Sequence, residues 1–144
     1  MAYRRIHNKG DWRHEEYVAA GTITPGMLIE LVAAGTVQAH STEGGRAERM
    51  VALEDALQGK TVADDYSADD IVTVALPAPG TVMNMLLAVG ETATIGEELI
   101  SAGDGTLKCL DNASSPSKVY QTIGYAMEAK TGHSVATLIT VRIK

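Results

Sequence analysis

Residues 69–90 read DDIVTVALPAPGTVMNMLLAVG and contain two apolar runs, each with the length of a β-strand. The first run, Ile71 to Leu76, lies between Asp69-Asp70 and Pro77-Ala78-Pro79-Gly80, and the second extends from Thr81 to Val89. Apolar runs of this length that are bounded by turn-forming residues predict strands. We therefore expect two consecutive strands here, joined by the turn that contains the two prolines.

Similar runs, separated by glycines and other turn residues, follow one another over most of the chain. These runs are Met27–Ala33, Thr36–His40, Arg49–Leu53, Glu98–Ser101, Thr106–Leu110, Tyr120–Glu128 and Val135–Ile143. Alternation within two of them predicts buried faces. The residues on these faces are Met27, Ile29, Leu31, Ile139, Val141 and Ile143. Short runs with dense turn signals are typical of an all-β protein, a small β-barrel or β-sandwich, rather than a helical bundle.

The segment from Met50 to Leu57 fits two interpretations. Met50, Leu53 and Leu57 have the spacing of one helix face, and Gly59 could end a helix. The same segment also continues the apolar run that begins at Arg49. We expect a strand through Leu53 followed by one short helical turn, so that the fold contains at most one or two such turns.

The length of 144 residues is enough for one domain, since a chain of this size buries roughly 68–70% of its unfolded surface. No apolar stretch approaches the roughly 20 residues of a membrane-spanning helix. The first residues lack the apolar core of a secretory signal, so we expect the chain to stay where it is made, without a membrane partner. Cys109 is the single cysteine, and we interpret it as a small buried residue or an idle thiol.

The formal net charge of −6 argues against a nucleic-acid-binding body, because such binding depends on Lys and Arg neutralising phosphates. The charge is unevenly distributed. Residues 1–16 carry four basic and three acidic side chains, a net charge of +1, which leaves −7 for the rest. A mildly basic N-terminal segment on an acidic body would suit docking on an acidic protein surface, although a solvated tail has the same composition.

The first 21 residues show no clear strand or helix period, and they contain aromatic and arginine side chains among polar ones. We therefore predict an extended N-terminal arm over residues 1–21, mobile in the free protein, and a body over residues 22–144. Large aromatic and arginine side chains dominate interface energetics. The candidate partner-binding residues are Tyr3, Arg4, Arg5, Ile6, Trp12, Arg13 and Tyr17. A Trp12 that folds back on its own body is the alternative.

The sequence contains no recognisable metal-binding or catalytic motif. The histidines, His7, His14, His40 and His133, lack the spacing of a zinc site. No Gly-x-Ser-x-Gly motif is present, and residues 64–70 carry four carboxylates without the pattern of a calcium loop. We predict no catalytic, cofactor-binding or metal-binding residues, and a protein that is not an enzyme.

Several segments, in their order and spacing, resemble the head decoration proteins of tailed bacteriophages, also called capsid cement proteins. The resemblance covers roughly residues 22–143. It is carried by Met50–Lys60, Asp69–Val72, Gly90–Leu99, Gly103–Leu107 and Ile123–Glu128. The resemblance implies a β-rich, β-tulip-like body that sits on the outer face of an icosahedral shell.

The same resemblance implies the partners. Decoration proteins clamp neighbouring major capsid subunits, often as homotrimers at three-fold or quasi-three-fold positions. The expected location is the virion exterior, after synthesis in the cytoplasm of the host bacterium, and the predicted arm is the expected contact with the major capsid protein.

A second resemblance leads to another function. Residues Val89 to Leu99 are similar to the hairpin of lipoyl- or biotin-carrying domains, which present a modified lysine at a tight hairpin. The nearest lysine is Lys108, flanked by Leu107 and Cys109, so the pattern is broken where the cofactor would be attached. A carrier domain and a generic ligand-binding β-barrel are the alternatives to virion decoration.

Overall fold

The computed structural model describes residues 5–115 and 119–144 and is almost entirely β-structure in these ranges. The strands are β1 (His7–Lys9), β2 (Trp12–Ala19), β3 (Leu28–Ala33), β4 (Thr36–Ala39), β5 (Met50–Ala52), β6 (Ile71–Pro77), β7 (Val82–Leu87), β8 (Glu98–Ser101), β9 (Leu107–Cys109), β10 (Thr122–Ala126) and β11 (Thr137–Ile143). Two 3₁₀ turns, η1 (Ala56–Gln58) and η2 (Leu110–Asn112), accompany them. The prediction of an all-β fold with one or two short helical turns is confirmed.

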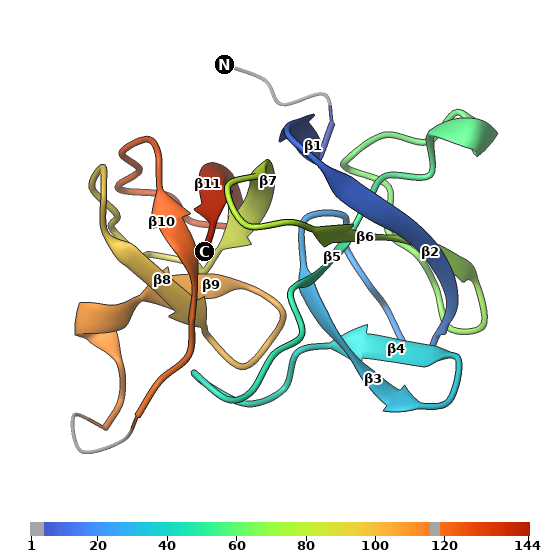
Figure 1. The fold of residues 1–144 in the computed structure, drawn as a ribbon, viewed down its shortest axis with the longest axis horizontal. Coiled ribbons are helices and arrows are strands. Elements are labelled where there is room, and N and C mark those ends of the chain that lie inside the picture. Colours follow the sequence, from blue (N-terminus) through green and yellow to red (C-terminus); the bar gives the residue numbers. More distant parts are fainter. Residues whose placement is uncertain (1–4, 116–118) are drawn as a thin grey trace.

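The strands form two barrels that lie side by side (Figure 1). The first barrel is closed in the order β2-β4-β3-β5-β6. The second has the order β7-β11-β10-β8-β9 and is closed by a parallel pairing of Leu87 in β7 with Leu107 in β9. Strand β1 lies outside this ring, at the end of the sheet, where it pairs with β7.

The two barrels share part of one core. Nine buried residues, among them Val72 and Val74 of β6, fill the first barrel. The larger cluster fills the second barrel and also includes Leu28, Val51, Leu53 and Ala75 from the first. Because successive side chains of a strand point to opposite faces, β6 contributes to both cores. The predicted single barrel or sandwich is therefore a pair of barrels joined through their apolar interiors.

The predicted buried faces are mostly correct. Ile139, Val141 and Ile143 of β11 are all buried, and so is Ile29 of β3. The prediction was wrong for Leu31, whose side chain is 47% exposed. Strand β5 pairs only with the first two residues of β3, so the second half of β3 has a strand neighbour on one side only, in β4.

Met27 was also expected on that buried face. It precedes β3 and is half-buried, and its sulfur lies 3.4 Å from the backbone nitrogen of Thr24. The side chain packs against the first core without entering it.

The predicted boundary between an arm over residues 1–21 and a separate body does not hold at strand β2, which is part of the first barrel. Strand β2 pairs with β6 from Trp12 to Val18 and closes the first barrel. Only Ala19 among the residues of β2 is fully buried, so the strand lacks the apolar alternation that would reveal it. Backbone pairing, not side-chain burial, holds β2 in place.

Gly124 of β10 offers a test of how tightly the second barrel is packed. A Cβ atom at this position would lie 2.4 Å from the carbonyl oxygen of Arg142 in β11. We predict that Gly124→Ala destabilises the protein by about 2–3 kcal/mol, because the backbone of the neighbouring strand must move. Urea unfolding followed by circular dichroism measures the change. Gly21→Ala is the control, since a Cβ there meets nothing within 4 Å, and its effect should stay within about 1 kcal/mol. Equal effects of the two substitutions would contradict the packing described here.

Candidate docking surface

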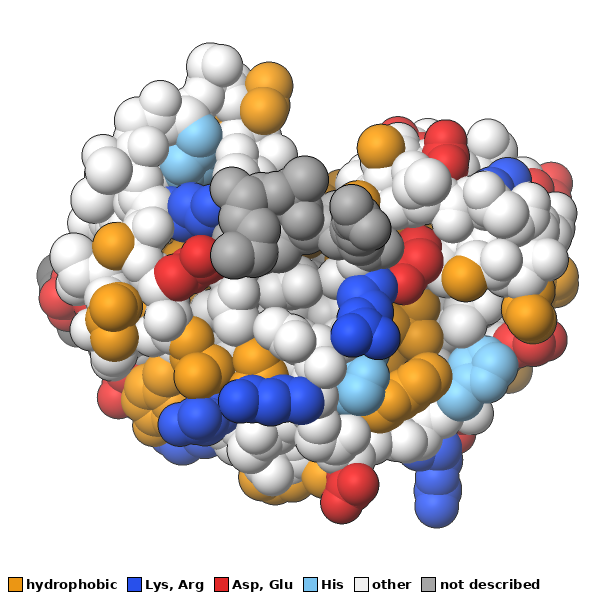
Figure 2. All heavy atoms as spheres, turned by 90° about the horizontal axis from the view of Figure 1, so that it is seen from above, with side chains coloured by type: hydrophobic (Ala, Val, Ile, Leu, Met, Phe, Trp, Pro, Cys, Tyr) orange, Lys and Arg blue, Asp and Glu red, His pale blue; other side chains and the backbone are white. Residues whose placement is uncertain are grey.

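An open groove of about 480 Å³ lies between the N-terminal strands and the segment that follows β5. One wall consists of Arg5, His7, Trp12 and His14. The other comes from residues 53–57. Figure 2 looks onto the face that carries the N-terminal end, where histidine and hydrophobic side chains lie beside basic and acidic ones on the lobe of the first barrel.

The first wall is built around Trp12. Its side chain is 37% exposed, and the rings of His7 and His14 lie 5.2 and 6.0 Å from the indole, measured between ring centroids. Trp12 and His14 are two residues apart on β2 and therefore project from the same face. His7 comes from β1 and is held by a contact of its Nε2 with the carbonyl oxygen of Gly10, at 3.1 Å. The groove therefore has an aromatic wall that belongs to two strands.

The opposite wall combines an apolar floor with acidic side chains. Leu53 is buried at the base, whereas Leu57, carried by the turn η1, is 94% exposed. The carboxylate of Glu54 accepts a hydrogen bond from the backbone nitrogen of Ile6, at 3.0 Å. This bond ties the first described residues to the opposite wall and so sets the width of the groove.

The groove is suited to binding another protein. Aromatic and large aliphatic side chains that remain exposed next to one another are typical of interface hot spots. Arg5 lies on one wall and Glu54 and Asp55 on the other, so charges of both signs are available to orient a partner.

The structure places the predicted arm residues in different environments. Arg5 and Trp12 line the groove, whereas the side chain of Arg13 projects from the other face of β2 and lines a separate cleft. Tyr17 is half-buried and donates a hydrogen bond to Glu15. Tyr3 and Arg4 lie outside the described residues.

The selection of Ile6 as a contact residue was wrong. Its side chain is 0% exposed and belongs to the core of the second barrel. Because the neighbouring residues in the sequence are polar, the sequence pattern does not predict that Ile6 belongs to the core.

Sequence reasoning missed His7, His14, Leu53 and Leu57 as members of this surface. The two histidines were considered as zinc ligands, for which their spacing is unsuited. The recurrence of His7, Trp12 and His14 within eight residues was the local signal available. No sequence pattern links Leu57 to Trp12, because the two residues are distant in the sequence and line the same groove only in the folded protein.

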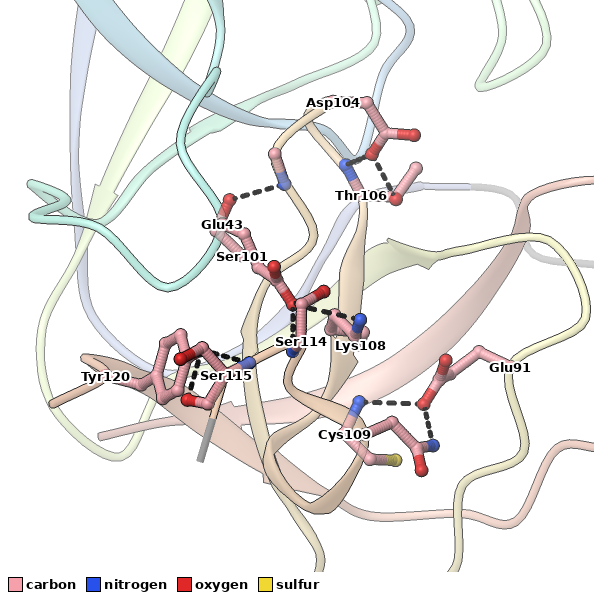
Figure 3. A network of polar contacts seen from close by, with 12 residues as sticks. Glu43, Glu91, Ser101, Asp104, Thr106, Lys108, Cys109, Ser114, Ser115 and Tyr120 are labelled. Atoms are coloured by element: carbon pink, nitrogen blue, oxygen red, sulfur yellow. Dashed lines mark hydrogen bonds and ion pairs between the residues drawn. The ribbon is translucent and has the colours of Figure 1, made fainter. Parts of the chain in front are cut away.

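Apart from the groove, a cluster of polar side chains joins the two barrels (Figure 3). Glu43, in the loop between β4 and β5, accepts hydrogen bonds at Oε1 from the backbone nitrogen of Ser114 (2.9 Å), the hydroxyl of Ser114 (3.0 Å) and the ammonium of Lys108 (3.0 Å). These donors, Ser114 first and Lys108 after it, lower the pKa of Glu43 to about 2. The carboxylate therefore stays charged and fastens this loop of the first barrel to the second barrel.

The same loop approaches the second barrel closely at Gly44. A Cβ atom here would lie 1.8 Å from the ring of Tyr120, and the φ of +61° also favours glycine. The hydroxyl of Tyr120 donates to the carbonyl of Ser115 at 2.7 Å. Gly44 thus allows the tyrosine ring to lie close against the loop.

Cys109 lies next to this cluster and is buried, as predicted. Its one S–H proton faces two acceptors, the carboxylate of Glu97 and the carbonyl of Thr92, each 3.3 Å from the sulfur, and Glu91 accepts from the backbone nitrogen of Cys109 at 3.0 Å. Burial, followed by the neighbouring carboxylate of Glu97, raises the pKa of the thiol to about 12. The thiol therefore stays protonated at neutral pH.

His40 forms a further link between the barrels. It is fully buried; its Nδ1 contacts the hydroxyl of Ser101 in β8 at 2.7 Å, and its Nε2 contacts the carbonyl of Arg46 at 2.8 Å. Both ring nitrogens are occupied by protein partners, so this histidine has a structural position.

Within residues 5–115 and 119–144, no group of three or more His, Cys, Asp or Glu residues is arranged to hold a metal ion. No helix in these ranges is long and apolar enough to span a membrane.

Comparisons with known proteins identify a fold. No protein-family model matches the sequence, and no curated protein matches it either. Among solved structures, the chain is similar to the N base of head fiber gp8.5 in bacteriophage phi29, with a TM-score of 0.57 and 16% sequence identity. The match covers 93% of this chain and 95% of that chain. This likeness extends over nearly the whole of both chains and shows the fold.

The contacts of Glu43 predict a pH-dependent contribution to stability. Because the pKa in the folded protein, about 2, lies below the ordinary value of 4.5, the contribution is fully present above about pH 4.5 and is lost as the pH falls towards 2. We expect Glu43→Gln to lower the free energy of unfolding by about 1–2 kcal/mol at pH 7 and by progressively less below pH 4.5. Urea unfolding at several pH values measures the difference. Glu16→Gln, at an exposed carboxylate of β2, is the control and should have little effect throughout. A Glu43→Gln deficit that is independent of pH would contradict this account.

Proposed function

We propose that this protein is a structural component of a bacteriophage head that binds the outer surface of the capsid. The fold likeness carries the proposal, because it extends over nearly the whole of this chain and of a head fiber base. The resemblance of residues 22–143 to decoration proteins supports the same role independently of the backbone. The groove around Trp12 supplies a surface of the kind that such a role requires.

Binding in the groove follows from its construction. Trp12 and Leu57 present apolar area that a partner side chain would cover, and the neighbouring rings of His7 and His14 reduce the freedom of the indole before binding. Preorganised aromatic anchors lose little conformational entropy on association. Arg5 and Asp55 would orient the partner without contributing most of the affinity.

The function needs no chemical transformation. A protein that binds the assembled shell better than free subunits stabilises the shell by mass action. We propose the major capsid protein as the partner, with neighbouring subunits clamped by one copy or by a homotrimer at a three-fold position. Several copies acting together would add avidity without an exceptional single contact. In this proposal the protein is not an enzyme, binds no cofactor, nucleic acid or membrane, and resides on the virion exterior.

The carrier alternative is less well supported. Lys108, the lysine nearest to the carrier-like hairpin, lies within β9, and its ammonium binds Glu43. A carrier domain presents its lysine freely at a hairpin tip. This position is therefore unsuited to attachment of lipoate or biotin.

The proposal predicts that loss of the groove anchors weakens capsid binding. We expect Trp12→Ala and Leu57→Ala each to reduce the affinity for capsids by roughly 30-fold, equivalent to about 2 kcal/mol, because each removes an anchor. Binding is measured by co-sedimentation with capsids of the phage that encodes the chain, purified from a mutant lacking it.

The matched control is Ile95→Ala, at a side chain that is 73% exposed on the second barrel and away from the groove. It should bind like the unmodified protein. Circular dichroism establishes that all variants are folded. Absence of binding by the unmodified protein would refute the proposed function, whereas equal binding by all variants would refute the groove as the contact surface.

A further inference from the structure

A second cleft, of about 390 Å³, lies on the other side of β2 from the groove. Arg13 of β2 lines it, and the segment before β5 contributes Glu48 and Arg49. Residues 76–79 and Lys144 complete the lining. Both barrels therefore contribute to this cleft, which lies at their junction.

The cleft is basic although the chain as a whole is acidic. Three cationic side chains, Arg13, Arg49 and Lys144, line it with one carboxylate, Glu48. None of the three cations forms an ion pair with another residue of the described ranges. On a protein with a net charge of −6, a cleft with three cationic side chains and one carboxylate is a local exception.

Arg49 is held in place with its charge unpaired. Its Nη2 donates to the carbonyl oxygen of Thr122 in β10, at 3.0 Å, which fixes the guanidinium across the junction of the barrels. Its Nε is buried and has no hydrogen-bond partner in the described structure. The side chain of Arg49 is partly buried, and a buried cation is normally paired, so this arrangement favours an anion in the cleft. The guanidinium is already positioned, so little of its conformational entropy remains to be lost on binding.

The rest of the lining restricts which anion fits. Leu76, Pro77 and Pro79 give the cleft an apolar side. Pro77 and Pro79 offer no backbone N–H to an anion, so on this side of the cleft the cationic side chains are the available donors. An apolar side suits the methylene groups and neighbours of a Glu or Asp in a protein chain. The net charge of the whole molecule opposes a polyanion such as a nucleic acid.

We propose that this cleft binds an acidic segment of a partner protein, with a carboxylate between Arg13, Arg49 and Lys144 and an apolar neighbour against residues 76–79. Only the identity of the partner rests on the proposed function: if the protein binds the capsid, the acidic segment belongs to a capsid subunit. Recognition by cations on one side of β2 and by the aromatic groove on the other would let a single strand contact two parts of a partner.

The test uses NMR of the full ¹⁵N-labelled chain without capsids. The probes are the peptides acetyl-Leu-Glu-Asp-Leu-amide and acetyl-Leu-Gln-Asn-Leu-amide, which differ in charge but hardly in shape. We expect the acidic peptide to shift the Nε–H resonance of Arg49 and the backbone amides of Leu76 and Lys144 in a saturable way. The amide peptide should bind at least about tenfold more weakly, because it lacks the carboxylates.

The double variant Arg13→Gln/Lys144→Gln supplies the matched comparison, since both side chains are exposed and their loss should leave the fold intact. It should lose the response to the acidic peptide. The control Arg142→Gln removes an exposed positive charge of β11 outside the cleft and should retain the response.

Several results would overturn the inference. They are the absence of saturable shifts, equal shifts with both peptides, and shifts that map to the groove around Trp12. Equal shifts with inorganic phosphate would indicate a simple anion site instead. Cleft shifts that appear on raising the protein concentration alone would make a second copy of the chain the occupant. Because no capsid is present, each of these outcomes leaves the proposed role in the phage head to be judged by sedimentation.

Discussion

The burial of β6 between the two apolar cores, with β7 buried directly after it, is the constraint on which the rest of the structure depends. Val72 and Val74 face the core of the first barrel, Ala75 faces that of the second, and all six residues of β7 are buried. The turn between these strands passes the chain from one barrel to the other. A strand that is covered on both sides must be apolar almost throughout, which is why residues 71–76 and 82–89 are the clearest runs in the sequence.

Much of the fold could be predicted from this local pattern, and the limits of the prediction have a physical cause. Strands with a buried face, such as β11, reveal themselves through alternation, and Gly59 marks the end of the short turn η1. Strand β2 shows no such alternation, because its side chains lie mostly at the surface and its position is fixed by backbone hydrogen bonds to β6. The second barrel is closed by the parallel pairing of Leu87 with Leu107. These residues are far apart in the sequence, so local sequence patterns do not predict that they pair.

The candidate surface could be predicted only in part for the same reason. Trp12 and Arg5 were recognisable from residue type, since exposed aromatic and arginine side chains are common in interfaces. Their partners across the groove come from residues 53–57, which reach this position through the pairing of β5 with β6. The alternation of β2 then separates Trp12 from Arg13, so that neighbouring residues serve two different surfaces. What was expected to be one adhesive arm includes a paired strand with two distinct sides.

The way the strands are closed also bears on behaviour at high concentration. A free sheet edge exposes unpaired backbone groups and can recruit another chain, which is a common route to aggregation. Here ten strands belong to closed rings, and the remaining strand, β1, is only three residues long and ends at an exposed lysine, Lys9. Short, charged edges resist such recruitment. The second half of β3, which pairs with β4 alone, is the other short edge in the described part of the chain. Ring closure therefore restricts self-association through strand edges to these two short segments.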